Sequence, residues 1–199
     1  MSRPVRRIAL LALLLACALP AGAQAAASTQ NVATAITEQD DSRVFDLAWD
    51  VAKQRGGVVD HFNAAHAAAR CARCKATAIA FQIVIVSGAP QTVAPINQAV
   101  ALNHECTDCT VVAEARQFVR VVDQPARLTG AGRAELADVQ RDLGALEAQD
   151  PPVDQLHQAV EQQEARVRHV LNTELVLKAD RHDEPEVLER QVAQESSLD

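Results

Sequence analysis

Four cysteines are the residues of this chain best suited to chemistry. Cys71-x-x-Cys74 and Cys106-x-x-Cys109 share one spacing. Three kinds of site use that spacing: structural disulfides, a zinc site with four thiolate ligands, and a redox-active C-x-x-C motif. The choice among them depends on the compartment of the protein and on the elements that carry the cysteines.

The first 27 residues predict an export signal. Three arginines precede an apolar run at 8–19, and small residues with A-x-A-like cleavage sites follow Pro20. This order is typical of a secretory signal peptide, and the run is too short to span a bilayer. We therefore expect residues 1–27 to be removed. The mature chain is then secreted or extracytoplasmic, with no transmembrane segment.

A lipoprotein signal is the alternative. Leu14-Leu15-Ala16-Cys17 loosely fits a lipoprotein box, with Cys17 as the residue to be acylated. The large Leu15 and the continuation of the apolar run past Cys17 favour an ordinary cleaved signal instead. A membrane-anchored lipoprotein remains the second hypothesis for localisation.

Export favours disulfides at the four cysteines. An even number of cysteines in an oxidising compartment is typical of disulfide bonding. Sequence leaves three connectivities open, and bonds within each C-x-x-C allow each segment to close by itself. Zinc at Cys71, Cys74, Cys106 and Cys109 is the alternative, with zinc as the cofactor. A thiol-redox role is the other, although redox C-x-x-C motifs usually lie at a helix N-terminus.

Several histidines could also bind a metal. His61, His66 and His104 lie near the cysteine-bearing segments. The simpler interpretation is that they are polar residues on partly exposed strands. We expect His157 and His169 on the surfaces of helices.

No familiar catalytic motif is present. The sequence contains no H-E-x-x-H, no G-x-S-x-G and no glycine-rich phosphate loop. Glu38, Asp40 and Asp41 could attract calcium, but they lack the remaining oxygen ligands of a calcium loop. We assign no catalytic residues, and the sequence favours a protein that is not an enzyme.

The cysteines belong to a threefold repeat. Each unit begins with Asn-x-Ala-x-Ala, at Asn31, Asn63 and Asn97. The second and third units also agree at both cysteines and at every second residue of 78–86 and 113–121. Spacing by two is typical of a strand, in which alternate side chains share a face. The repeat therefore predicts extended segments despite its many alanines.

Each unit predicts a strand, a tip and a second strand. We expect residues 28–125 to form three antiparallel β-hairpins with the cysteines at the second and third tips. The strand pairs are 31–37 with 44–53, 62–70 with 76–87, and 97–104 with 110–122, and the tips are 38–43, 71–74 and 105–109.

The C-terminal third changes to a helical pattern. Within 129–177, apolar residues recur at steps of three and four, interrupted at Pro151-Pro152. This predicts a helical hairpin that covers one sheet face or forms a coiled-coil homo-oligomer. Residues 178–199 contain seven acids and three bases, which predicts an acidic disordered tail. The expected fold class is mostly β with a helical C-terminal part (α+β).

Charge and composition restrict the partners. The formal net charge is −7, and removal of the arginine-containing signal makes the mature chain more acidic. A basic patch for nucleic acid or an anionic membrane surface is therefore not expected. With aromatic residues at 3%, the core must consist of small aliphatic side chains.

The pattern Asn63-x-Ala-x-Ala … Cys71-x-x-Cys74 … Ala78-x-Ala-x-Gln, repeated from Asn97, resembles a group of uncharacterised secreted actinobacterial proteins. The resemblance covers about residues 30–122 and implies no activity, cofactor or site residue. The sequence thus predicts an exported structural or binding module stapled by disulfides, with an unknown protein or cell-envelope partner. A zinc or thiol-redox protein and a helix-mediated interaction protein are the alternatives.

Overall fold

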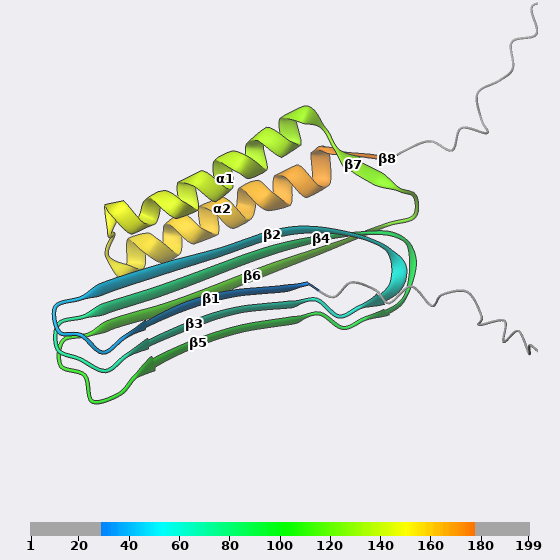
Figure 1. Cartoon of the computed structure of the whole chain (residues 1–199). Coiled ribbons are helices and arrows are strands. Elements are labelled where there is room, and N and C mark those ends of the chain that lie inside the picture. Colours follow the sequence, from blue (N-terminus) through cyan, green and yellow to red (C-terminus); the bar gives the residue numbers. More distant parts are fainter. Residues whose placement is uncertain (1–28, 178–199) are drawn as a thin grey trace, which may run out of the picture.

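The computed structural model describes residues 29–177, which are mostly β with two helices (Figure 1). The signal segment 1–27, Cys17 and the tail 178–199 lie outside the described residues. The elements in chain order are β1 (Gln30–Thr37), β2 (Arg43–Val59), β3 (Phe62–Ala69), β4 (Lys75–Val93), β5 (Ile96–Asn103), β6 (Thr110–Val122), β7 (Ala126–Leu128), α1 (Gly130–Gln149), α2 (Val153–Thr173) and β8 (Leu175–Leu177).

The repeats form two parallel sheets, in the orders β1-β3-β5 and β2-β4-β6. Each strand pairs with its counterpart in the neighbouring repeat, so that Asn31 lies beside Asn63 and Asn63 beside Asn97. The predicted antiparallel hairpins are therefore wrong. The chain leaves β1, turns through an arch and enters β2 in the opposite sheet, and the three repeats stack as coils of a β-solenoid.

Stacking of identical residues explains the parallel arrangement. Alanines of the inward rows of both sheets meet between the sheets in one buried cluster, and Val59, Val84 and Val86 form a second, smaller one. A methyl group fills little space, so the sheets approach closely only if every coil presents a small residue at the same place. In-register parallel pairing meets this condition, because it sets each residue beside its own copy. The spacing by two was thus interpreted correctly, but the pairing partner was not.

An asparagine ladder runs through the interior. Asn31 Nδ2 donates to Asn63 Oδ1 at 2.7 Å, and Asn63 Nδ2 donates to Asn97 Oδ1 at 2.8 Å. The same amides also donate to carbonyls of the opposite sheet, including those of Ala80 and Arg116 at 3.2 Å. Buried amides must be hydrogen-bonded, so the ladder fixes both the coil register and the sheet spacing.

The helices cover the outer face of the β2-β4-β6 sheet (Figure 1). On β4 this face carries Ile79, Phe81, Ile83 and Ile85, all essentially buried. The apolar stripes of both helices pack on this sheet face together with these residues. The stripes that the sequence offered for a coiled-coil dimer are therefore buried within the chain.

Prediction for the ladder. Asn63→Ala should lower the free energy of unfolding by about 3 kcal/mol, because it leaves buried hydrogen-bonding groups without partners. Urea unfolding followed by circular dichroism measures the loss. Asn97→Ala is the matched control and should cost only about 1 kcal/mol, since water reaches that end of the ladder. Equal losses of unfolding free energy in the two variants would contradict the claim that the buried amide of Asn63 stabilises the fold more than that of Asn97.

Candidate functional site

The cysteines lie in two arches that stack on each other. One arch joins β3 to β4 and the other joins β5 to β6. Arg73 N donates to the carbonyl of Thr107 at 2.8 Å, and Thr110 N donates to that of Cys74 at 2.9 Å. The parallel pairing of the strands thus continues through the arches and brings the two C-x-x-C motifs together.

Each arch has a residue in the left-handed region at an equivalent place. These residues are Asp41, Arg73 and Asp108, with φ of 59°, 56° and 57°, and the third arch has a second such residue, Glu105, with φ of 50°. Aspartate tolerates this conformation, whereas a long side chain such as that of Arg73 adopts it at some cost. The three arches therefore share this turn, although only two of them contain cysteines.

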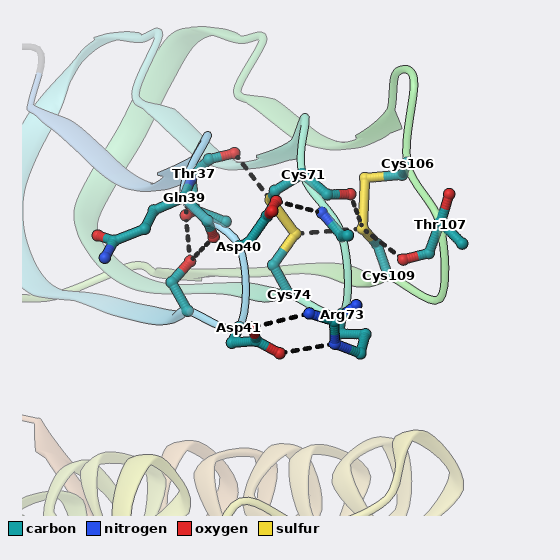
Figure 2. Close-up of a disulfide and its surroundings, with 12 residues drawn as sticks. Thr37, Gln39, Asp40, Asp41, Cys71, Arg73, Cys74, Cys106, Thr107 and Cys109 are labelled. Atoms are coloured by element: carbon teal, nitrogen blue, oxygen red, sulfur yellow. Dashed lines mark hydrogen bonds and ion pairs between the residues drawn. A yellow bond between two sulfur atoms is a disulfide. The ribbon is translucent and has the colours of Figure 1, made fainter.

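Both motifs form disulfides, Cys71–Cys74 and Cys106–Cys109, with Cα atoms 6.1 Å and 5.8 Å apart (Figure 2). The expected disulfide bonding is therefore present, with each bond inside one motif. Cys71 and Cys74 are buried, and the Cys106–Cys109 pair is partly exposed.

The two disulfides are in direct contact. Cys74 Sγ lies 3.1 Å from Cys109 Sγ, and all four sulfur atoms lie within 4.8 Å of one another. Cys109 Sγ also lies 2.9 Å from the carbonyl oxygen of Cys71. Four sulfurs so close together make this the one group of potential metal-ligating side chains identified within residues 29–177.

The first arch, between β1 and β2, has polar contacts in place of a disulfide. Asp40 Oδ1 accepts from Ala72 N at 2.8 Å, and Asp41 accepts two hydrogen bonds from Arg73 at 2.7 and 2.8 Å (Figure 2). The hydrogen bond from Arg73 lowers the pKa of Asp41 below its ordinary value and raises the pKa of Arg73. Asp40 and Asp41, two of the calcium candidates, thus bind the next arch of the chain.

The structure does not bring the histidines to the cysteines. His61 is buried between Thr29 and Gln54, with its Nε2 2.8 Å from Gln54 Oε1. It lies just before β3, at the end of that strand opposite to Cys71. His104 is exposed and lies 3.8 Å from a carboxylate oxygen of Glu105.

The other histidines belong to the sheet and helix surfaces. His66 is in the middle of β3, in the row between Thr34 and Val100. His157 on α2 contacts the buried carboxylate of Glu114, so it helps to hold the helix on β6. His169 is exposed on α2.

Sequence reasoning missed the polar groups of the interior. Asn31, Asn63 and Asn97 were recognised as repeated, but not as a ladder. Gln117 Nε2 likewise donates to Gln82 Oε1 at 2.7 Å across neighbouring strands. Identity of an amide residue at equivalent places in successive units is the signal that indicates such ladders.

Comparisons with known proteins give no relative: no family model, no curated protein and no solved structure matches the chain. Among residues 29–177, neither helix combines the length and the apolar character that a membrane span requires.

Prediction for the disulfides. Closing a loop of about four residues stabilises by about 2 kcal/mol in the chain-entropy model. Replacing Cys71 and Cys74 together by alanine should cost this amount and more, because the pair is also buried. The matched control replaces Cys106 and Cys109, which close an equal loop but are more exposed. Urea unfolding measures the loss of stability in both variants. A larger loss in the Cys106/Cys109 variant than in the Cys71/Cys74 variant would contradict this prediction.

Proposed function

We propose that the mature chain is an exported structural and binding module without catalytic activity, stapled by its two disulfides. The observation that carries this proposal is the stacking of both disulfides in neighbouring arches of a parallel solenoid. A C-x-x-C between strands, repeated in the next coil, has the setting of a structural crosslink. It lacks the helix N-terminus that lowers the pKa of a redox-active thiol.

Because the core between the sheets is thin, the disulfides add stability that apolar burial alone does not supply. Alanines form the buried cluster between the sheets, and each contributes only one methyl group to apolar burial. The aromatic side chains and most of the larger aliphatic ones pack on the outer face under the helices, and Val59, Val84 and Val86 form a smaller buried cluster away from the helices. The buried cluster at the arches contains Cys71 and Cys74, with Cys106 and Cys109 packed against it, and no described residue of either helix belongs to it. There the disulfides supply the constraint.

Three observations support export. The first 27 residues have the composition of a signal peptide, disulfides persist in oxidising compartments, and the repeat resembles secreted proteins. We propose the extracytoplasmic space or the cell envelope as the place of action, with a lipid anchor at Cys17 as the less favoured route.

Prediction for the oxidation state. Protein isolated from the exporting cell, denatured in the presence of excess alkylating agent and digested under non-reducing conditions, should contain both pairs in oxidised form. Mass spectrometry of the peptides measures this. Recovery of four alkylated thiols would contradict the staple and the proposed compartment together.

Zinc binding is the second candidate function, supported by the convergence of the four sulfurs within 4.8 Å. Tetrahedral zinc with Zn–S bonds of about 2.3 Å needs sulfurs about 3.8 Å apart. Reduction would free the two bonded sulfur pairs to move apart toward that separation, and all four sulfurs already lie within 4.8 Å of one another. Residues 71, 74, 106 and 109 would then hold the ion in a closed structural site.

Prediction for zinc. Protein reduced with a phosphine should bind one zinc per chain if the thiolates form this site, with release of protons from the thiols. Competition with a coloured chelator measures the affinity. The Cys106→Ala variant retains three thiols and should bind far more weakly. Equal affinity in the two proteins would exclude the four-thiolate site. Stoichiometric zinc in protein purified without added metal would instead make zinc the native state.

A further inference from the structure

The two ends of the solenoid are unequal, and the first coil is closed by carboxylates. Asp46 Oδ2 accepts from the backbone N of Thr34 at 2.6 Å, and Asp50 Oδ2 accepts from Thr29 Oγ1 at 2.9 Å. Asp46 occupies the place that Ala78 holds in the next coil. An inward-facing charge is a common device that prevents further strand pairing at a sheet edge.

The last coil is open. Ala99 and Ala101 on β5 belong to the same rows as Ala33 and Ala35 of the first coil, which are fully buried. On β5 these inward positions are exposed. The reason lies in the stagger of the sheets. β1 packs on both β2 and β4, and β3 packs on both β4 and β6, but β5 packs chiefly on β6. Figure 1 shows β5 as the outermost strand of its sheet.

The hydrogen bonds of the asparagine ladder indicate where an additional strand would pair, namely next to β6. Asn31 Nδ2 donates to carbonyls on β2 and β4, and Asn63 Nδ2 donates to carbonyls on β4 and β6. Asn97 Nδ2 donates to Ala115 O on β6 at 3.1 Å, with no second carbonyl partner within the described residues. By the pattern of the other two coils, the second carbonyl belongs to a strand that would lie beyond β6.

A hollow adjoins the free edge of β6. It has a volume of about 360 Å³ and lies between the second half of β6 and the C-terminal half of α2. Its lining includes the consecutive residues Gln117, Phe118, Val119 and Arg120. Because successive side chains of a strand point to opposite faces, a hollow lined by all four lies along the edge of the strand.

We infer that this place, beside β6 and over the inward face of β5, binds an extended segment of another polypeptide by strand addition. The segment pairs with the free edge of β6 in parallel, supplies a carbonyl to Asn97, and places small uncharged residues over Ala99 and Ala101. This inference rests on the proposed binding role of the module and names the surface and the class of partner.

A second copy of the chain fits this place poorly. Head-to-tail stacking would set β2 of one copy beside β6 of the other. Asp46 would then lie over the alanines of β5, without its present partner Thr34 N, as a buried and uncompensated charge. Residues 96–103 carry no charge of their own that could neutralise it.

A synthetic peptide tests the inference. The probe has the sequence of residues 110–122 with Glu114→Lys, Arg116→Glu and Arg120→Glu. The peptide keeps the inward-facing residues of β6, and its outward-facing charges are opposite in sign to those of β6 at the same positions. Fluorescence anisotropy should show saturable binding to the oxidised protein. Ala99→Arg should weaken binding at least about tenfold, or 1.4 kcal/mol, by filling the place. Gln98→Arg, exposed on the other face of β5, is the matched control and should bind as the parent does.

The other outcomes overturn the inference. Absence of binding, or equal weakening by Ala99→Arg and Gln98→Arg, would exclude strand addition at this place. If the same sample contains both disulfides in oxidised form, the proposed disulfide-bonded module is still supported. Failure of strand addition can therefore be distinguished from failure of the proposed function. Sedimentation of the oxidised protein should show a monomer. Association that Ala99→Arg abolishes would mean that a second copy fills the place, against the assignment to another polypeptide.

Discussion

In-register contact between copies of the same residue is the constraint on which the whole structure depends. Two parallel sheets approach closely because alanine lies beside alanine in successive coils, and asparagine amides bridge the sheets at one level. At the buried positions of the middle coil, such as Ala65, Ala80 and Asn63, a larger or unpaired polar residue would separate the sheets or leave a buried amide unsatisfied. The repeat therefore reflects a packing requirement of each strand on its own copy.

The other features compensate for what such a core lacks. The two helices bury the large aliphatic and aromatic side chains of the β2-β4-β6 sheet on its outer face, including the neighbouring rings of Trp49, Phe81 and Phe118. Disulfides constrain two arches, and the hydrogen-bonded Asp41–Arg73 pair links the first arch to the second. The same stacking that brings four sulfurs together also leaves β5 exposed at the end of the coil series.

Much of the local structure was predictable, and the pairing was not. Spacing by two at 78–86 identified strands, and steps of three and four after residue 129 identified helices, because both depend on neighbours within one segment. Whether Asn63 pairs across its own arch or with Asn97 depends on contacts between repeats, which local periodicity does not contain. The strict identity of Asn31, Asn63 and Asn97 carried that information. The convergence of the four cysteines followed from the repeat, whereas the enclosure of His61 by Thr29 and Gln54 had no signal in the sequence.

Nuclear Overhauser contacts across the strands test the central claim most directly. In oxidised, isotope-labelled protein, parallel in-register stacking predicts contacts between the methyl groups of Ala33 and Ala65, and of Ala65 and Ala99. It also predicts contacts between the side-chain amides of Asn31 and Asn63. Strong Hα–Hα contacts between 62–69 and 75–87, the mark of an antiparallel hairpin within one repeat, would contradict the account.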